Sequence, residues 1–354
     1  TNARADRVGH NISAGYLKID QTVAGYYDNT NTTAALLMSV NGLSVVSNVV
    51  NMGDYRVQIG DSFADDTNAG VIMVSSAQNG RANWTNGASA FTNNFQTPCA
   101  IPYGGGYWEA GIFRCPPNSS TTANQGEDNV DLTEAYFPFT TWRGGYALNG
   151  ANGLELTNLI ASPDLVLGTH FRDYWTNSAI SDAVANGVYY LDLRPFGIDS
   201  RRDGVLLVNH AKNEANYALS RVNNDDDEMD GTWTIYTHDN RANGRSYEQD
   251  PVAFVFVPKA DTTIVSGMFM GDAAIAIHSG ASPAFTVTNF STGQYELKIP
   301  GRSPADGILI VSPAGGDANN GDNIVTFAKN TAGDGWIIQS RDLPGCGLQT
   351  PPDT

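Results

Sequence analysis

The sequence is poor in charge and has no long apolar run, and each shortage excludes a class of partner. Of the 354 residues 16% are charged, against about 25% in an average soluble protein. Lys and Arg number 20 and Asp and Glu 37, which gives a net charge of −17. This field repels nucleic acid and anionic membranes, so we expect neither as a partner. No apolar run approaches the ~20 residues that a membrane-spanning helix needs. Asn, Thr, Ser and Gly supply the polar surface instead, which is typical of secreted all-β proteins.

The sequence also has few residues that carry metal or catalytic chemistry. Its 5 histidines and 3 cysteines form no HxH or HExxH motif. There is no Gly-x-Ser-x-Gly elbow for a serine nucleophile. Cys99 and Cys115 flank a short Gly-rich segment and are a disulfide candidate, and the alternative is that both stay reduced. Cys346 is left over, either free or paired between chains. A carboxylate pair for glycosidic chemistry is a spatial arrangement that the sequence neither shows nor excludes.

One strand pattern occurs three times. Each copy has a Gly-x-Tyr strand, then a Gly-led apolar strand, then a strand that begins at Trp or Tyr-Trp. The first strands are Gly53–Ile59, Gly187–Leu193 and Gly293–Ile299. The second strands are Gly70–Val74, Gly204–Val208 and Gly307–Val311. The third strands are Tyr107–Ile112, Trp233–Thr237 and Trp336–Ser340. A unit used three times predicts a repeat architecture and not a single catalytic domain.

The spacing of these strands predicts the fold class. Runs rich in Val, Ile, Tyr, Phe and Thr alternate with Gly, Asn, Asp and Ser turns almost throughout, so the chain is expected to be all-β. We expect three tandem β-sandwich or flattened-barrel units at 8–134, 135–250 and 251–346, with a tail at 347–354. The first unit is divergent and carries the Cys-containing insertion. The repeated Tyr and Trp are expected in the cores, and 174–186 is the one stretch that favours a short helix.

An aromatic strand occurs between the units. It is present twice, as Ala135–Phe139 and Ala253–Pro258, although there are three units. If it closes the preceding unit, the third unit lacks its last strand; if it opens the following unit, the first unit lacks one. In either case a terminal unit exposes a strand edge, and such edges promote association. We therefore expect head-to-tail association in which a neighbouring molecule covers that edge.

Two sets of residues are candidates for ligand binding. Asp225, Asp227 and Asp230 lie in an acidic loop whose oxygens suit calcium, although the spacing is not that of an EF-hand and a solvated acidic turn is the alternative. The candidate glycan contacts are aromatic residues in loops, because aromatic faces offer large rigid surfaces. They are Trp84, Tyr103, Trp108 and Trp175.

Several segments of the second and third units resemble a repeat in large, uncharacterised secreted proteins of environmental bacteria. The similarity covers about 135–346. The segments are Phe137–Phe139, Trp142–Gly145, Asp250–Pro258, Gly293–Gly301, Asp306–Val311 and Trp336–Pro344. The resemblance implies an extracellular or cell-surface β-repeat protein, and it implies no activity and no site residues.

These observations favour a protein that acts through its surface and not as an enzyme. We expect an extracellular structural or adhesive component that self-associates into a filament or layer, with no cofactor other than calcium. A carbohydrate-binding repeat protein is the first alternative and would need exposed aromatic residues on a concave face. A polysaccharide-degrading enzyme is the second and would need two carboxylates of unequal environment in a cleft.

Overall fold

The computed structural model describes the chain in segments. They are residues 12–21, 32–40, 45–51, 54–59, 70–75, 77–78, 96–104, 107–114, 134–143, 146–149, 166–169, 180–182, 187–211, 217–223, 229–238, 250, 252–315 and 323–342. Within these segments the protein is all-β. It contains one short 3-10 turn (η4, Arg194–Phe196) and no α-helix. Accordingly, the described segments contain no helix with the length and apolarity to cross a membrane.

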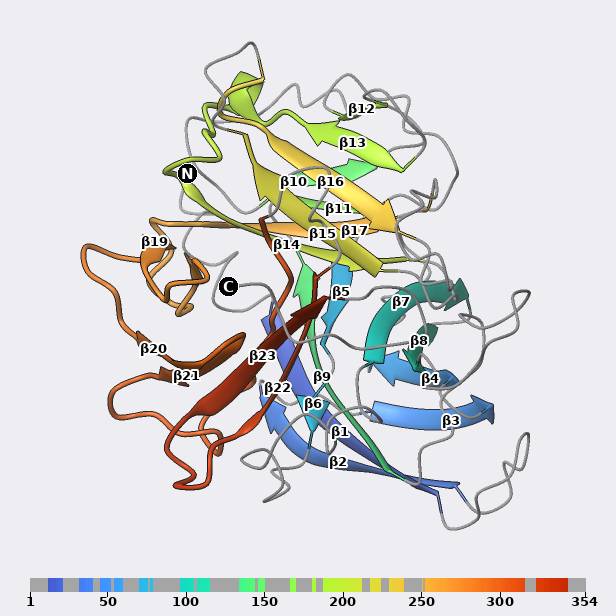
Figure 1. Ribbon diagram of the computed structural model, residues 1–354. Coiled ribbons are helices and arrows are strands. Elements are labelled where there is room, and N and C mark those ends of the chain that lie inside the picture. Colours follow the sequence, from blue (N-terminus) through green and yellow to red (C-terminus); the bar gives the residue numbers. More distant parts are fainter. Residues whose placement is uncertain are drawn as a thin grey trace.

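Three four-stranded antiparallel arrays share one strand order: an outer strand, the Gly-x-Tyr strand, the Trp strand, and the strand that precedes the Trp strand. Array 1 consists of β3 (Val45–Asn51), β4 (Asp54–Ile59), β8 (Tyr107–Arg114) and β7 (Gln96–Gly104). Array 2 consists of β12 (Ile180–Asp182), β13 (Val188–Leu191), β16 (Trp233–His238) and β15 (Tyr217–Val222). Array 3 consists of β20 (Thr286–Ser291), β21 (Gln294–Lys298), β23 (Trp336–Asp342) and β22 (Asn323–Lys329). In Figure 1 the arrays lie at the lower right, top and lower left.

The register within the arrays is the same three times. Each Trp is paired with the residue two positions after the Tyr of the Gly-x-Tyr strand. The pairs are Val57 with Trp108, Leu191 with Trp233, and Leu297 with Trp336. Because a shift of one residue would turn every side chain to the other face, an identical register repeats the same inward-facing set. The sequence pattern is therefore a pattern of strand pairing.

The remaining strands form second layers. One layer has the order β2 (Thr32–Val40), β1 (Ile12–Gln21), β9 (Glu134–Arg143) and β5 (Gly70–Val74). Another has the order β10 (Tyr146–Asn149), β11 (Val166–Thr169), β17 (Val252–Pro258) and β14 (Gly204–His210). Next to array 3 there is a separate hairpin of β18 (Gly267–Phe269) and β19 (Ile275–His278), and β6 (Ala77–Gln78) pairs with β9 and β22. The sheets are predominantly antiparallel, and those of the described residues do not close into a barrel.

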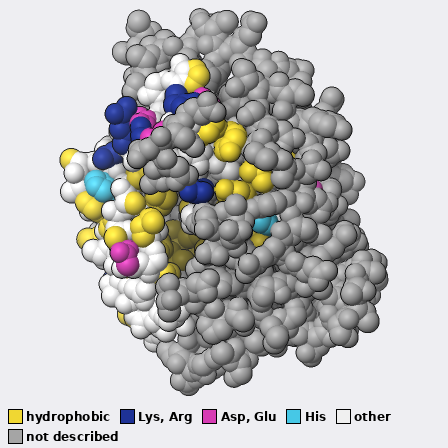
Figure 2. All heavy atoms as spheres, turned by 45° about the horizontal axis from the view of Figure 1, so that its top comes forward, with side chains coloured by type: hydrophobic (Ala, Val, Ile, Leu, Met, Phe, Trp, Pro, Cys, Tyr) yellow, Lys and Arg dark blue, Asp and Glu magenta, His cyan; other side chains and the backbone are white. Residues whose placement is uncertain are grey.

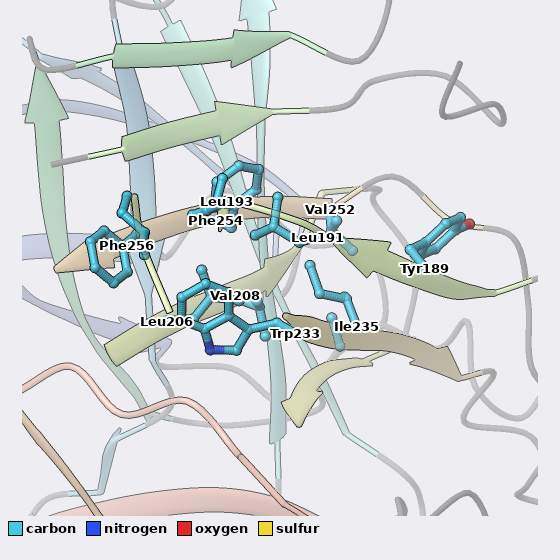
Figure 3. Packing of buried hydrophobic residues seen from close by; sticks show 12 residues of the cluster. Tyr189, Leu191, Leu193, Leu206, Val208, Trp233, Ile235, Val252, Phe254 and Phe256 are labelled. Carbon is cyan, nitrogen blue, oxygen red and sulfur yellow. The ribbon is translucent and has the colours of Figure 1, made fainter. Parts of the chain in front are cut away.

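Array 2 and its second layer form a β-sandwich core. Trp233 of β16 is 1% exposed and meets Phe256 of β17 edge to face, with ring centroids 5.6 Å apart. Leu191 of β13 and Leu206 of β14 belong to the same cluster. Figure 3 shows these side chains pointing toward one another from the two layers. The prediction that the repeated Trp and Tyr lie in the core is confirmed for array 2, where Tyr189 is also buried.

Array 3 has a less regular second layer. Its inner face carries Tyr295 and Trp336, which are buried. Against them pack side chains of the hairpin β18–β19, such as Phe269, and side chains of the Gly307–Val311 segment, such as Leu309. The third core is thus covered partly by chain that is not in a strand.

The expected helix at 174–186 is wrong where the structure describes it. Ile180–Asp182 form β12, which pairs antiparallel with β13. Pairing with a neighbouring strand overrides the weak local preference of so short a segment.

Candidate functional site: an open strand edge beside array 3

The Gly-led strands β5 and β14 and the third Gly-led segment, Gly307–Val311, meet at the centre of the molecule. Met73 of β5 is buried there in one cluster with Val205 of β14. Leu207 and Ile310 pack against the same cluster. These contacts bring together three segments that begin more than 100 positions apart from one another in the sequence. Each of them presents apolar side chains to the centre.

A closed set of hydrogen bonds links the three segments. In each segment the polar residue that follows the last Val bonds to both backbone groups of the last Val in a neighbouring segment. Ser75 Oγ donates to Val311 O and accepts from Val311 N, both at 2.9 Å. Ser312 Oγ donates to Val208 O at 3.1 Å and accepts from Val208 N at 3.2 Å.

The third link is made by an amide. With the Asn209 nitrogen turned toward the carbonyls, it donates to Val74 O at 3.2 Å, and the amide oxygen accepts from Val74 N at 2.9 Å. This orientation satisfies both ends of the side chain, which is the criterion by which an amide is assigned. The links run from the first segment to the third, from the third to the second and from the second to the first, so the set closes on itself.

A second cyclic set involves parallel strand contacts. The strand before each Trp strand pairs with the residues just after the Gly-led segment of another copy. Cys99 of β7 pairs with His210, Ser220 of β15 pairs with Ala314, and Phe327 of β22 pairs with Ala77. The three copies therefore contact one another in the same way around the centre.

The first two Gly-led segments are each paired with an aromatic strand. β5 is antiparallel to β9, with Val74 opposite Phe139. β14 is antiparallel to β17, with Val208 opposite Phe254. β17 is buried along its whole length. Each aromatic strand thus completes the layer that contains the Gly-led strand preceding it in the sequence.

The third Gly-led segment is not a strand, which corrects the expectation for Gly307–Val311. Among the described residues it has no strand partner, and its five residues are half-buried, whereas four of the five in Gly204–Val208 are buried. The segment is nevertheless extended, because Leu309 and Ile310 pack in different cores. Since Val311 N and O both face Ser75, the backbone groups of Ile308 and Ile310 point to the opposite edge.

The glycines that begin the second and third Gly-led segments differ in how closely other atoms approach them. A Cβ at Gly204 would lie 2.2 Å from Val257 O and 2.7 Å from Phe256 Cε2, so β17 approaches too closely for any other residue. A Cβ at Gly307 would have no described atom within 4 Å. No described residue occupies at Gly307 the position that the aromatic strand occupies at Gly204.

Apolar side chains are exposed in the same region. Among the described residues the large hydrophobic side chains that are exposed are Val265 (43%), Met270 (52%) and Phe290 (52%). All three lie in or beside β18 and β20. Figure 2 shows hydrophobic side chains on the left and toward the centre of this face, and Figure 1 has β19 and β20 on the left.

The hairpin beside this edge is anchored by side-chain hydrogen bonds. Tyr295 Oη donates to Gly271 O at 3.0 Å, and Asn289 Nδ2 donates to the same oxygen at 3.0 Å. Burial, and to a lesser extent the Asp272 carboxylate, raises the pKa of Tyr295, so its hydroxyl stays a donor. The hairpin β18–β19 is therefore held against β20 and β21.

The acidic loop is only partly within the described residues. Asp225 and Asp227 lie outside them. The Asp230 carboxylate is 2.5 Å from Arg201 Nη1, and Arg201 also bonds to Asp199 at 2.8 Å. A hydrogen bond from Arg201 lowers the pKa of Asp199 to about 2. Within the described part of the chain no group of three or more His, Cys, Asp or Glu residues is placed to hold a metal ion, and a guanidinium already neutralises Asp230.

Of the other candidate residues in the described part of the chain, Tyr103 and Trp108 lie on neighbouring strands, and Trp108 pairs with Pro102. Trp84, Trp175 and Cys115 lie outside the described part. Cys99 and Tyr103 are in β7 and Trp108 is in β8, where the backbone alone is described. Trp108 has the same register as the two core tryptophans Trp233 and Trp336. It lies opposite Val57, as Trp233 lies opposite Leu191 and Trp336 opposite Leu297.

A buried pair was not found from the sequence. His210 Nε2 lies 3.1 Å from Asp250 Oδ2, and both side chains are fully buried. In the sequence His210 is near Glu214, but in the structure its partner is Asp250, which lies two positions before β17. Because no solvent reaches either group, the pair joins the end of β14 to the start of β17 and is not placed to contact a substrate.

A scan against protein-family models, a search of curated proteins and a search of solved structures each give no match to this chain. The functional argument consequently rests on the geometry of the described residues.

Proposed function

We propose that the protein is a structural or adhesive component of an extracellular assembly and that it self-associates head to tail through the region of array 3. The observation that carries the proposal is the edge of Gly307–Val311, which has no strand partner among the described residues. Met270, beside the hairpin β18–β19, and Phe290, in β20, add exposed apolar surface to the same part of the chain. An unpaired edge beside apolar surface favours association with another chain.

We further propose that the chain consists of three tandem β-sandwich units. The identical strand order of the three arrays supports this, as do the identical Trp registers and the two cyclic sets of contacts. In this organisation β9 closes the first unit and β17 closes the second. Among the described residues no aromatic strand lies beside the third Gly-led segment, and this is the edge that we propose for assembly.

The arrangement around the centre favours one particular surface for assembly. Two of the three Gly-led segments are paired along the edge away from the centre, and all three are linked at the centre by Ser75, Asn209 and Ser312. Among the described residues Gly307–Val311 is therefore the Gly-led segment whose outer edge lacks a strand partner, and we propose that neighbouring molecules bind there. The low charge content and the resemblance to secreted repeat proteins support an extracellular location.

The experiment is to measure the mass of the native protein by light scattering over a range of concentrations. We expect the mass to rise with concentration, and Phe290→Asp to reduce the rise because it adds charge to the exposed apolar surface. Ala332→Asp is the matched control, since it adds the same charge to an exposed turn at the other end of array 3. A wild-type protein that stays a monomer at all concentrations would overturn the proposal.

A further inference from the structure

We propose that the open edge of Gly307–Val311 is a docking site for an antiparallel β-strand from another polypeptide chain, with aromatic or aliphatic side chains at alternate positions. This inference rests on the proposed role of the third unit in assembly, and it names the element that covers the edge. It goes further because it defines the sequence pattern, direction and register of that element.

The protein itself contains two examples of the occupant. β9 and β17 each pair antiparallel with a Gly-led strand, and each presents Phe opposite the last Val of that strand. In β17 the side chains of Phe254 and Phe256 enter the core between the layers, where both are fully buried. A strand that completes the third layer has to bury the same kind of side chain against the same kind of surface.

The glycine at 307 gives a second, independent observation. Gly204 is required where it stands, because a Cβ there would collide with Val257 O and Phe256. Gly307 has no such requirement among the described residues, and its φ is not in the left-handed region. A glycine inside an extended segment weakens it and often marks the close approach of another backbone. An incoming strand that approaches as β17 approaches Gly204 supplies that backbone.

The strand order of the second layers indicates where the docked strand would lie. In the second unit the order is β10-β11-β17-β14, with the aromatic strand between a strand pair and the Gly-led strand. In the third unit the strand pair is the hairpin β18–β19, which forms a separate two-stranded sheet. The docked strand would lie between this hairpin and Gly307–Val311 and would pair with the latter.

The register follows from the second unit. Val205 is opposite Val257, and Leu207 is opposite Val255. Ile308 and Ile310 hold the corresponding places in the third segment, and their backbone groups point to the open edge. The incoming strand would therefore exchange backbone hydrogen bonds with Ile308 and Ile310.

The residues that follow β23 do not carry the required pattern. Leu343–Thr354 contain no aromatic residue, no Val and no Ile, and they include two adjacent prolines. Proline cannot donate to a strand ladder. Leu343–Thr354 are therefore not the occupant that we propose.

The first test uses a peptide with the sequence of Asp250–Lys259, lengthened at one end with lysines for solubility and carrying a fluorophore. Its binding to the purified full-length chain is measured by fluorescence anisotropy. We expect saturable binding, and binding weaker by at least about tenfold when both Phe254 and Phe256 of the peptide are replaced by Asp, because their apolar surface drives docking. Equal binding of the two peptides, or no binding of the first, would overturn the inference.

The second test uses Gly307→Val. In the free protein the new side chain meets no described atom, so we expect an unchanged thermal midpoint and an unchanged circular dichroism spectrum. In the complex it would collide with the incoming backbone, so we expect peptide affinity to fall by at least about tenfold. Ala305→Val, on the exposed loop two residues earlier, is the matched control and should bind as the wild type does. A Gly307→Val protein that folds and binds the peptide normally would refute the docking geometry.

A third measurement locates the peptide. Benzoylphenylalanine in place of Phe256 of the peptide should cross-link to Gly307–Val311 or to β18–β19, and cross-links elsewhere would overturn the proposed site. The outcomes also separate the two proposals. If the protein stays a monomer and binds the peptide in this way, the proposal of self-association is wrong and that of the docking site stands. If the Gly307→Val protein assembles normally and the peptide does not compete with assembly, the proposal of self-association stands and that of the docking site is wrong.

Discussion

The hydrogen bonds at the centre of the molecule lead to a quantitative prediction. Ser312→Ala removes one hydroxyl that bonds to both Val208 N, at 3.2 Å, and Val208 O, at 3.1 Å. Val208 is 2% exposed, and its pairing with β17 uses the other edge of the strand. The substitution therefore leaves a buried N–H without its partner, which costs about 1–3 kcal/mol. We expect the free energy of unfolding to fall by about 2 kcal/mol.

The assay is urea unfolding followed by tryptophan fluorescence, since Trp233 lies in the core that contains Val208. Ser282→Ala is the control, because Ser282 is an exposed loop residue. Loss of its hydroxyl should change stability by less than about 0.5 kcal/mol, as surface substitutions usually do. A Ser312→Ala protein as stable as Ser282→Ala would refute the role of the central hydrogen bonds.

The closed set makes a stronger test possible. Ser75→Ala should cost about as much as Ser312→Ala, because it removes the equivalent pair of bonds to Val311. If the three links hold one common junction, the double variant should deviate from additivity by about 0.5 kcal/mol or more. Strict additivity would mean that each link acts on its own pair of segments alone.

Four further predictions concern the described side chains. Burial lowers the pKa of His238 from 6.5 to about 4, so the unfolded chain takes up a proton first and stability should fall from about pH 6.5 to about pH 4. His238→Gln should flatten that part of the urea midpoint profile. The pKa of Asp199, about 2, should rise toward its ordinary value in Arg201→Gln when followed by NMR, so the stability that Asp199 supplies would be lost at a higher pH on acidification. Trp233→Ala should cost about 3–5 kcal/mol in calorimetry or denaturant unfolding. Because Arg201 already pairs with Asp230, a calcium chelator should leave the mass of the native protein unchanged, and dissociation on chelation would contradict this.

The strands of this fold were predictable where their signal is local. Alternation of apolar and polar residues after Gly53, Gly187 and Gly293 predicts β4, β13 and β21, and each is present. Gly307–Val311 has almost the same apolar pattern as Gly204–Val208 but no strand partner among the described residues. Strand formation depends on a neighbour that the segment itself does not encode, so the pattern alone could not separate the two.

From the sequence one could predict that one Gly-led segment lacks an aromatic partner, but not which one. Two aromatic strands against three Gly-led segments predict one Gly-led segment without an aromatic partner, and the sequence alone allows it at either end. Deciding between the ends requires the pairing of β9 with β5 and of β17 with β14, which joins segments far apart in the chain. The partner of Asp230 was hidden for the same reason, since Arg201 precedes it by 29 residues and is brought near by the fold.

The contrast between Gly204 and Gly307 supports our proposal that assembly uses the edge of Gly307–Val311. In the second unit the apolar Gly-led strand is buried by β17, and the cost of its glycine is offset by the close packing that the glycine allows. Gly307–Val311 keeps a half-buried apolar surface and two backbone positions, Ile308 and Ile310, that face an edge without a strand partner among the described residues. Both unfavourable features disappear together only when another strand binds there. A partner that covered Met270 and Phe290 but did not pair with this edge would leave the backbone groups of Ile308 and Ile310 without a strand partner, which is why a donated strand fits the region better than a flat apolar contact.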